Sequence, residues 1–311
     1  VGGLIPLAGW SFSAAKDGVD LLLTIDRGLQ YKACEKLAQA KQEYGAVSAA
    51  LIIMDPNTGA IRTMCSVPEF DPNQYGKAES ADGYNNSAIF TQYEPGSVFK
   101  PITMAAALNE AVVTADSSFN DTGSRSGLCS KPIKNASEKV YGFQSMSEIL
   151  ENSVNTGAVY LVEKLGKKKF IEYAQNFGFG IKSGIELDSE VSGNIDTLFE
   201  NKSEKVDCYT ATASFGQGIT ATPLQLVSAF ATIANGGKLL KPYIIDEIKN
   251  ADGSIEKTKS KEIRQAIDNR AAMLVSGMLV NVIDKGHAKQ AGVKGYYVGG
   301  KTGTAQISGL G

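Results

Sequence analysis

A predicted β-hairpin early in the chain limits the fold more than any other feature of the sequence. Val47–Met54 is an apolar run of strand length, Asp55–Gly59 has the residues of a turn, and Ile61–Val67 resumes as a second strand. Tyr296–Val298 predicts a strand near the end of the chain. The pattern between is mostly helical. We therefore expect an α+β fold in which the first and last parts build one antiparallel sheet and the helices cover it.

Capping residues and apolar spacing predict where the helices lie. Asp26 is an expected N-cap, and Thr222 followed by Pro223 is another typical helix start. Helices are expected over residues 26–45, 97–109, 147–165 with a break around Ser153, 222–233 and 268–282. Residues 114–144 are rich in Ser, Gly and Lys, which predicts loops with little regular structure. Residues 1–20 are expected to be a connecting segment.

Composition excludes several classes of function. Of the 311 residues, 43% are hydrophobic and 21% are charged, and the formal net charge is −2. No basic patch indicates nucleic acid or an anionic membrane surface, and no run reaches the roughly 18 apolar residues of a membrane span. The single histidine, His287, argues against a Ser-His-Asp triad and excludes a metal site with several His ligands. We expect it in an exposed polar turn.

The four cysteines, Cys34, Cys65, Cys129 and Cys208, are scattered and form no CxxC pair. This spacing argues against a zinc site or a thioredoxin-type redox site. A disulfide stays open as an alternative. Because a large core does not need one, we expect unpaired thiols.

Ser97 and Lys100 form the first candidate catalytic motif. Residues at i and i+3 share one side of a helical turn. A serine hydroxyl is a poor nucleophile until a base removes its proton, and a lysine whose pKa is lowered by burial or by another cation can be that base. Pro101 fits only near a helix start, which predicts a turn tighter than α-helical. Taken alone, the motif more often marks a surface capping serine.

Two further motifs can complete such a site. Ser153-Val-Asn155 falls in the predicted helix break, where a second hydroxyl can relay a proton and an amide can hold a peptide bond. Lys301-Thr-Gly-Thr304 has a lysine and hydroxyls that can bind a carboxylate, and Gly303 lets another backbone approach closely. Taken alone, the first is more often a polar helix cap and the second an ordinary glycine-rich turn.

In this order and spacing, the three motifs resemble the signature of penicillin-binding proteins and class A β-lactamases, although Val154 replaces the aspartate of the S-D-N motif. The surrounding sequence is similar to class B penicillin-binding proteins over roughly residues 16 to 307. The segments that carry the resemblance are Lys16–Asp26, Tyr93–Pro101, Glu151–Ala158, Phe215–Leu226 and Gly299–Ala305. The resemblance implies a transpeptidase domain over residues 21–311, with a mostly helical subdomain beside the sheet.

The resemblance implies a D,D-transpeptidase that crosslinks the stem peptides of peptidoglycan and is acylated by β-lactams. Ser97 would attack the carbonyl between the two terminal D-alanines, with Lys100 as the base. Ser153 would help carry the proton to the departing D-alanine. The backbone N–H groups of Ser97 and Thr304 would form the oxyanion hole.

The resemblance also implies the binding residues and the partners. Asn155 would bind the substrate amide, and Lys301, Thr302, Gly303 and Thr304 would form the carboxylate-binding segment. No metal, organic cofactor or nucleic acid is expected. The parent protein would be anchored in the membrane, with this domain on the outer face of the bacterial cytoplasmic membrane, and would act in cell division or elongation. A SEDS-type glycosyltransferase would be its partner through an upstream region.

Two alternatives stay open. A serine β-lactamase needs a group that activates the deacylating water, and Glu186 and Glu190 lie in the right part of the chain, but nothing around them indicates that role. A non-catalytic β-lactam sensor would keep the first and third motifs. The segments Lys16–Asp26 and Phe215–Leu226 favour the transpeptidase.

Members of the family continue past the third motif through further strands and a helix, whereas this chain ends at Gly311. We therefore expect a truncated domain whose sheet is incomplete at its C-terminal end. The helix that begins near Asp26 and the sheet face of Leu51 and Ile53 are expected to lack a packing partner. A chain longer by about 50–80 residues, enough for two or three strands and a helix, is expected to unfold more cooperatively.

Overall fold

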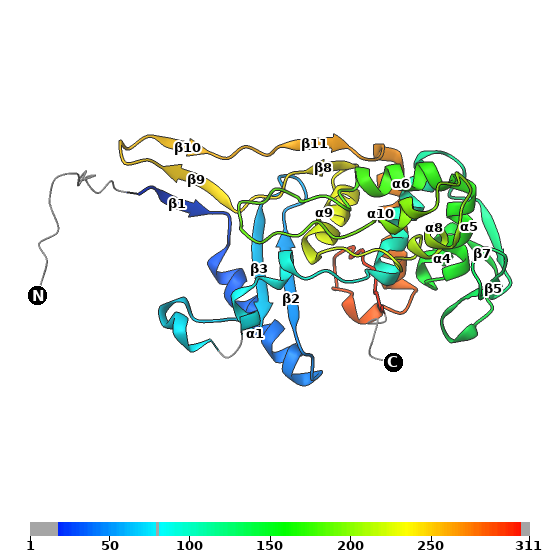
Figure 1. Cartoon of the computed structure of the whole chain (residues 1–311), viewed down its shortest axis with the longest axis horizontal. Coiled ribbons are helices and arrows are strands. Elements are labelled where there is room, and N and C mark those ends of the chain that lie inside the picture. Colours follow the sequence, from blue (N-terminus) through cyan, green and yellow to red (C-terminus); the bar gives the residue numbers. More distant parts are fainter. Residues whose placement is uncertain (1–17, 79–80, 306–311) are drawn as a thin grey trace, which may run out of the picture.

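Helices and strands gather in different parts of the molecule. The computed structural model describes residues 18–78 and 81–305. Figure 1 shows most helices in one body. Two hairpins extend from it in different directions: residues 49–67 run downward in this view and residues 245–257 run to the left. The fold class is α+β as predicted, but within the described residues it is built from several small antiparallel sheets rather than from one.

The predicted early hairpin is confirmed. β2 (Ala49–Met54) pairs antiparallel with β3 (Ile61–Val67). Asp55 Oδ1 accepts from the Asn57 N–H at 2.9 Å, an Asx turn that reverses the chain between the strands. Local turn chemistry therefore sets this hairpin, which is why the sequence alone predicted it.

The predicted N-caps Asp26 and Thr222 are confirmed, and Asp268, the first residue of another predicted helix, is an N-cap as well. Asp26, Thr222 and Asp268 each accept from a backbone N–H three residues on, at 2.9, 3.2 and 2.6 Å. They begin α1 (Arg27–Glu43), α9 (Pro223–Ala234) and α10 (Asn269–Asp284). The other described α-helices are α2 (Ser87–Phe90), α3 (Lys100–Asn109), α4 (Met146–Glu151), α5 (Asn155–Leu165), α6 (Lys167–Asn176), α7 (Thr197–Glu200) and α8 (Cys208–Ala213). Short 3₁₀ turns are η1 (Pro72–Lys77), η2 (Ala81–Tyr84), η3 (Gly96–Phe99), η4 (Ala136–Glu138) and η5 (Lys289–Ala291).

The main hydrophobic core surrounds α3. Every residue of this helix from Lys100 to Leu108 is buried, as expected for a helix that neighbours cover on all sides. Just before it, the Phe99 ring packs against Phe170 and Phe179, with ring centroids 6.1 and 4.9 Å apart. None of the described helices is both long and apolar enough to cross a membrane. Lys100, the second residue of the first candidate motif, therefore begins a helix that is buried from its first residue to Leu108.

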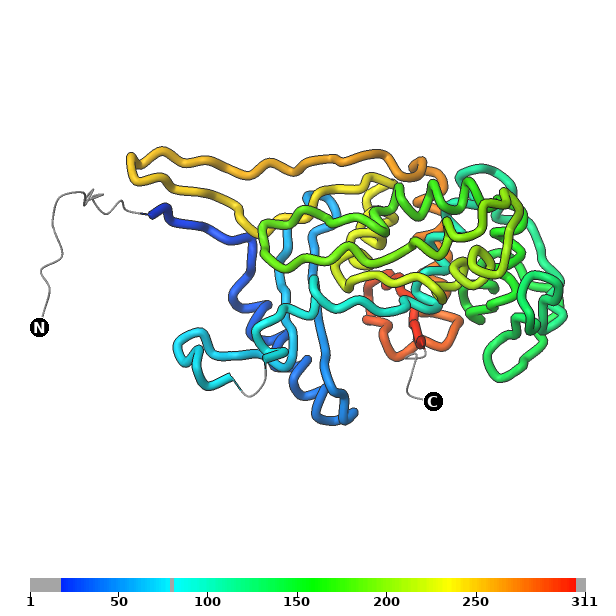
Figure 2. The backbone as a smooth tube through the Cα atoms, viewed as in Figure 1, coloured from blue at the N-terminus to red at the C-terminus, as the bar shows by residue number. Residues whose placement is uncertain are grey.

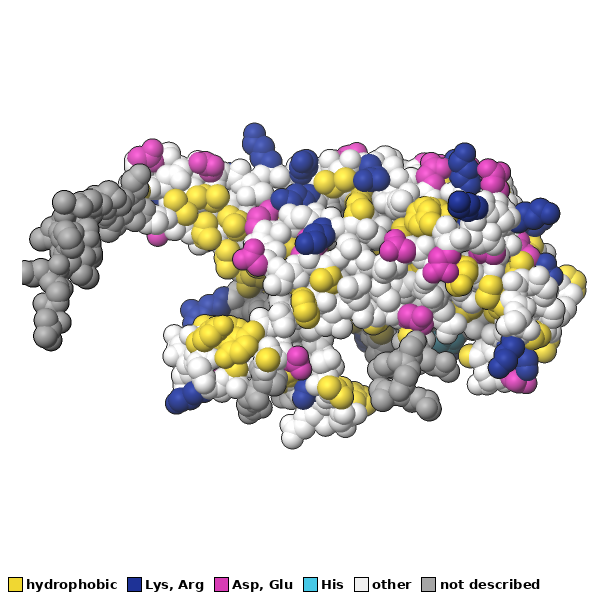
Figure 3. Space-filling view, viewed as in Figure 1, with side chains coloured by type: hydrophobic (Ala, Val, Ile, Leu, Met, Phe, Trp, Pro, Cys, Tyr) yellow, Lys and Arg dark blue, Asp and Glu magenta, His cyan; other side chains and the backbone are white. Residues whose placement is uncertain are grey.

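A three-stranded antiparallel sheet projects from the helical body (Figure 2). It consists of β1 (Asp20–Leu23), β9 (Ile245–Lys249) and β10 (Ile255–Lys257). β8 (Lys238–Leu240) and β11 (Glu262–Gln265) pair beside it. Figure 3 shows hydrophobic side chains along the projecting strands, where the exposed ones are Val19, Leu21, Leu22, Leu23 and Ile255.

α1 covers the β2–β3 hairpin only in part. The Gln30 side chain donates to the Met64 carbonyl and accepts from the Met64 N–H, each at 2.9 Å, and so ties α1 to β3. None of the residues of α1 is buried, and Leu51 and Ile53 of β2 are half-buried. Within the described residues, this face of the hairpin is therefore only partly covered.

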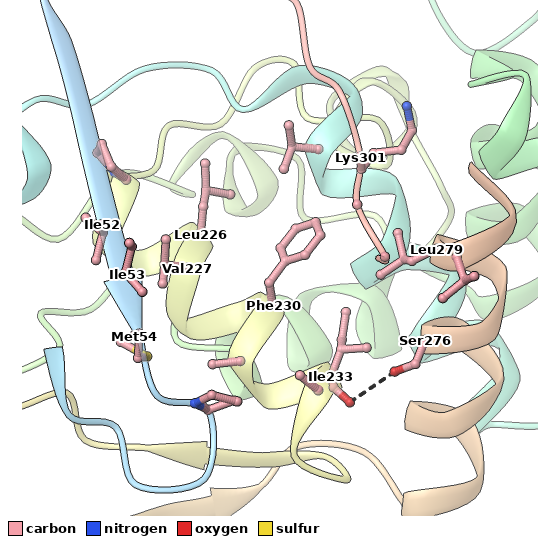
Figure 4. A pocket seen from close by; sticks show the side chains of 18 of the residues that line it. Ile52, Ile53, Met54, Leu226, Val227, Phe230, Ile233, Ser276, Leu279 and Lys301 are labelled. Carbon is pink, nitrogen blue, oxygen red and sulfur yellow. Dashed lines mark hydrogen bonds between the residues drawn. The ribbon is translucent and has the colours of Figure 1, made fainter. Parts of the chain in front are cut away.

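An apolar groove of about 870 Å³ is lined by β2, α9 and α10. Figure 4 shows Ile52 and Met54 on one side, Phe230 of α9 in the middle and Leu279 of α10 on the far side. Lys301 is the only charged residue among the described residues that line it, and its amine lies at the edge (Figure 4). The groove therefore lies beside the polar candidate site rather than within it.

The strand predicted at Tyr296–Val298 is wrong. The Tyr296 N–H donates to the Val293 carbonyl at 3.0 Å, which is a turn contact. Tyr296 and Tyr297 are 77% and 93% exposed, so they do not alternate between a buried and an exposed face. A strand requires hydrogen bonds to a neighbouring strand, and no described strand pairs with this segment.

Residues 114–144 are more regular than predicted. They contain β4 (Ser118–Asp121), β5 (Ser124–Arg125) and β6 (Ile133–Lys134), and they lead into β7 (Gly142–Ser145). β4 pairs with β7, and β5 pairs with β6. These strands are two to four residues long, too short for a period of apolar residues to be visible in the sequence.

The expectation of unpaired thiols is also wrong. Cys34 pairs with Cys65 and joins α1 to β3, and Cys129 pairs with Cys208 and joins the β5–β6 loop to α8. The paired residues are 31 and 79 positions apart. Tertiary contacts between separate elements therefore decide the pairing, which cysteine spacing alone cannot reveal.

Replacing both Cys129 and Cys208 by alanine is expected to lower the free energy of unfolding by about 2–4 kcal/mol, because the unfolded chain would regain the freedom of a long loop. Urea unfolding followed by circular dichroism measures the change. The Cys34–Cys65 bond stays intact and serves as the internal control. An unchanged unfolding midpoint would contradict a stabilising role for this disulfide.

Candidate active site

The candidate site centres on the amine of Lys100. This residue begins α3 and is 1% exposed. Its Nζ donates to the Ser153 carbonyl, to Ser153 Oγ at 3.1 Å and to Asn155 Oδ1 at 2.7 Å. A lysine ammonium has three N–H donors, so all of them are used. The structure therefore brings the first and second motifs together around one nitrogen.

Ser97 lies one turn before this lysine. It belongs to the 3₁₀ turn η3, so the expectation of a turn tighter than α-helical holds. Ser97 is half-buried, its carbonyl accepts from the Lys100 N–H, and its hydroxyl forms no hydrogen bond with a described residue. Gly96 has φ +56°, and a Cβ there would lie 2.6 Å from the Thr304 carbonyl. Glycine is therefore required where the third motif approaches the serine.

Ser153 adopts an unusual backbone conformation. Its φ is 54°, in the left-handed region that favours glycine. The N–H groups of Ser153 and Val154 donate back to α4 at 3.2 and 2.9 Å, the Schellman pattern that ends many helices. Val154 is buried and anchors this turn. The fold therefore keeps a serine, with its hydroxyl, in a backbone conformation that glycine would adopt with less strain.

The third motif closes the site from the C-terminal side. Lys301 Nζ donates to Ser153 Oγ at 3.0 Å and to the Thr302 carbonyl at 3.2 Å. A Cβ on Gly303 would lie 2.9 Å from the Pro95 carbonyl, so its backbone runs against the segment that precedes Ser97. Thr302, Gly303 and Thr304 are exposed. Two lysines from opposite ends of the chain thus meet at one serine hydroxyl.

Burial changes the proton affinity of both lysines. Burial, and then the charge of Lys301, hold the pKa of Lys100 well below its usual value of 10.5. Burial alone lowers the pKa of Lys301 to about 8. The pKa of His287 is lowered too, by the partial desolvation of its ring and then by the charges of Lys301, Lys100 and Lys139. His287 is exposed as predicted. The neutral form of the Lys100 amine is therefore favoured relative to that of an exposed lysine.

Sequence analysis missed the residues that support Asn155. Asn155 Nδ2 donates to the Lys134 carbonyl at 2.9 Å. Behind this contact lies a buried polar group formed by Asp121, Asn135 and Thr156. The Asp-Thr-Gly sequence that begins at Asp121 is a turn signal. Nothing in a single sequence indicates that this turn meets the start of α5.

The acidic residues considered for a β-lactamase are engaged elsewhere. Glu186 pairs with Lys241 Nζ at 2.9 Å. Glu190 accepts from the N–H groups of Ser183 and Gly184, at 2.7 and 3.0 Å. In the part of the chain that the structure describes, no group of three or more His, Cys, Asp or Glu side chains is arranged to hold a metal ion.

A serine and a buried lysine one helical turn apart, on an α+β scaffold, point to the class of serine acyl-transferases that includes penicillin-binding proteins and serine β-lactamases. Comparison with family models narrows this class. Residues 49–311 match the penicillin binding protein transpeptidase domain. The chain belongs to this family.

Individual relatives agree with the family. Over 301 residues the chain is 36% identical to stage V sporulation protein D of Bacillus subtilis, covering 95% of this chain and 45% of that protein. It is 30% identical to a peptidoglycan D,D-transpeptidase FtsI homolog of Mesostigma viride, with 94% and 52% covered. The chain spans about half the length of these curated relatives.

Solved structures confirm the fold. Penicillin binding protein 3 from Mycobacterium tuberculosis, complexed with aztreonam, superimposes with a TM-score of 0.86 at 26% sequence identity, covering 95% of this chain and 67% of that chain. The D,D-transpeptidase domain of a peptidoglycan glycosyltransferase from Eggerthella lenta gives 0.81 at 26% identity, with 94% and 73% covered. The described elements are therefore those of a transpeptidase domain.

Replacing Ser153 by glycine is expected to give a protein about 1 kcal/mol more stable than the alanine variant, because glycine has no Cβ to strain in the left-handed region. Both variants lose the hydroxyl that accepts from the two lysines, so the comparison isolates the backbone. Thermal melts of the two variants measure the difference. Equal melting temperatures, or a more stable alanine variant, would contradict this account.

Proposed function

We propose that this chain is the catalytic domain of a serine D,D-transpeptidase that crosslinks the stem peptides of peptidoglycan. The observation that carries the proposal is the buried Lys100 amine, one helical turn after Ser97, with a lowered pKa and hydrogen bonds to Ser153 and Asn155. Relatives named as peptidoglycan D,D-transpeptidases support the same reaction.

In the first half of the proposed reaction, the substrate acylates Ser97. Ser97 Oγ attacks the carbonyl carbon between the two terminal D-alanines of the substrate, and the neutral Lys100 amine takes the proton of the Ser97 hydroxyl. The backbone N–H groups of Ser97 and Thr304 stabilise the developing oxyanion. Ser153, whose Oγ lies 3.1 Å from Lys100 Nζ, passes a proton to the leaving nitrogen. The C–N bond breaks, and D-alanine departs with an ester left on Ser97.

The second motif and the third motif hold the donor peptide. Asn155 binds the substrate amide. Lys301, with a pKa of about 8, stays mostly protonated at neutral pH and binds the terminal carboxylate together with the Thr302 and Thr304 hydroxyls. Gly303 keeps this backbone close to the serine turn.

In the second half, the amino group of a neighbouring stem peptide attacks the ester. It gives up a proton to the basic site, the ester bond to Ser97 breaks, and the hydroxyl of Ser97 is restored. No cofactor is needed, because Lys100 supplies the base and backbone N–H groups supply electrostatic stabilisation. β-Lactams acylate the same serine in this proposal, and a relative's structure in complex with aztreonam supports it.

The engaged carboxylates favour a transpeptidase over a β-lactamase. Hydrolysis of the acyl-enzyme needs a group that activates water, whereas Glu186 is paired with Lys241 and Glu190 with backbone N–H groups. A slow loss of the acyl group separates a transpeptidase from a β-lactamase. Crosslinking of stem peptides separates it from a sensor.

The properties of the whole parent protein are part of the proposal. We propose that it is anchored in the bacterial cytoplasmic membrane, with this domain on the outer face where peptidoglycan is crosslinked. A SEDS-type glycosyltransferase is the proposed partner, because crosslinking acts on newly made glycan strands. Stem peptides and β-lactams are the proposed small ligands.

A fluorescent penicillin is expected to label the protein once, at Ser97, and the Ser97→Ala variant is expected to stay unlabelled. Lys100→Ala should slow acylation by about 10²–10⁴, because the general base is lost. Gel fluorescence and peptide mass spectrometry measure both. Ser276→Ala, a serine of the apolar groove outside the motifs, is the matched control and should label normally. Labelling that persists in Ser97→Ala would overturn the proposal.

The acylation rate is expected to rise with pH through the pKa of Lys100, because only the neutral amine can accept a proton. This pKa lies well below 10.5, so the rise should be complete well before that pH. The Lys301→Gln variant removes a neighbouring positive charge, which should raise the Lys100 pKa and move the rise to higher pH. Stopped-flow acylation rates measure the shift. A shift toward lower pH would contradict the prediction that the charge of Lys301 lowers the pKa of Lys100.

A further inference from the structure

A buried carboxylate lies behind the second motif and takes no part in the reaction described above. Asp121 ends β4 and is 1% exposed. Its Oδ1 accepts from the Gly123 N–H at 2.9 Å and from Thr156 Oγ1 at 2.6 Å. Its Oδ2 accepts from Asn135 Nδ2 and from the Tyr141 N–H, both at 2.8 Å. A carboxylate offers about four acceptor sites, so each is matched by a neutral donor.

Gly123 lies in the turn directly after Asp121, and the other three donors come from two different parts of the fold. Asn135 and Tyr141 belong to the chain between β6 and β7, whereas Thr156 is the second residue of α5. Asn135 and Thr156 are themselves 5% and 4% exposed. The Thr156 N–H donates to Asn135 Oδ1 at 3.1 Å, which adds a direct bond between the two parts. Asp121 therefore clamps the β6–β7 segment to the first turn of α5.

Asn155 connects the clamped segment to Lys100, the candidate base, through hydrogen bonds on both sides of its amide. The carbonyl of Lys134, the neighbour of Asn135, accepts from Asn155 Nδ2 at 2.9 Å. On its other side, Asn155 Oδ1 accepts from Lys100 Nζ at 2.7 Å. Asn155 is also the chain neighbour of Thr156, which Asp121 holds. The orientation of this amide is therefore fixed by the clamped backbone on one side and faces the lysine on the other.

We propose that Asp121 is a positioning residue for acyl transfer: it clamps residues 134–135 to the first turn of α5 and so fixes the Asn155 amide and, through it, the Lys100 amine. This inference rests on the proposed function, because it assigns Asp121 a part in the reaction at Ser97. The hydrogen-bond partners of Asp121 are Gly123, Asn135, Tyr141 and Thr156, none of which is a motif residue.

The chemistry of the cluster explains why the residue is an aspartate. Burial would raise the pKa of Asp121, but hydrogen bonds from Thr156, from the Gly123 and Tyr141 backbone and from Asn135 outweigh it and hold the pKa below its usual value of 3.8. Asp121 is therefore ionised at neutral pH and acts only as an acceptor. An asparagine would direct an NH₂ donor at other donors.

The test uses variants of Thr156 in the full-length protein that contains this chain. Thr156→Val keeps the side-chain shape but removes the 2.6 Å hydrogen bond to Asp121. We expect its second-order rate of acylation by a fluorescent penicillin to fall about 10- to 100-fold, the cost of a small misplacement of catalytic groups. Thr156→Ser restores the hydroxyl and should recover the rate to within about threefold of the wild type.

Thr210→Val is the matched control. Thr210 is also fully buried, and its Oγ1 donates to a carboxylate, Asp207 Oδ1, at 2.8 Å at the start of α8. This variant therefore loses the same kind of bond, at a residue whose side chain is not hydrogen-bonded to Asn155 or to the residues that hold it. Its melting temperature should fall as in Thr156→Val, while its acylation rate should stay within about threefold of the wild type.

The outcomes separate this inference from the proposed function. Loss of rate in Thr156→Val, recovery in Thr156→Ser and a normal rate in Thr210→Val support the clamp. A wild-type rate in folded Thr156→Val overturns it. If Thr156→Val does not fold, Asn135→Ala is measured instead, and its acylation rate is expected to fall about tenfold. A wild-type rate in folded Asn135→Ala would likewise overturn the clamp. Labelling of Ser97→Ala in the same assay would instead overturn the proposed function.

Discussion

The burial of one lysine amine is the constraint on which the rest of the site depends. An ammonium group taken out of water loses several kcal/mol of solvation unless acceptors replace the water. Lys100 meets this requirement with the Ser153 carbonyl, Ser153 Oγ and Asn155 Oδ1, which use all three of its donors. The remaining cost of burial favours the neutral amine. The three acceptors therefore hold the amine in place, and its burial prepares it as a base.

The scaffold supplies these acceptors through a break between two helices. Ser153 ends α4 in the left-handed region and Asn155 begins α5, so both side chains reach the same nitrogen from a short, fixed turn. Val154 buries its side chain between them. This explains why valine is compatible with the second motif although aspartate is more common there: the middle residue serves packing, and the outer two face the lysine.

A second cation gives the site its electrostatic character. Lys301 shares the Ser153 hydroxyl with Lys100 at 3.0 Å, although the two lysines come from opposite ends of the chain. Burial lowers the proton affinity of both lysines, and the charge of Lys301 lowers that of Lys100 further. The extents differ, since Lys100 is fully buried and Lys301 half-buried. One amine is thereby suited to accept a proton and the other to keep one.

The sequence by itself determined the local features, because adjacent residues create them: the Asp26 cap, the hairpin around Asp55, the tight turn before Pro101 and the motifs that identified the family. The tertiary structure alone decided which distant groups meet. It paired cysteines 31 and 79 positions apart, left Tyr296 without a partner among the described strands and placed Asp121 behind Asn155. Caps and turns are short-range hydrogen bonds that a few residues specify, whereas these contacts exist only once the core has packed.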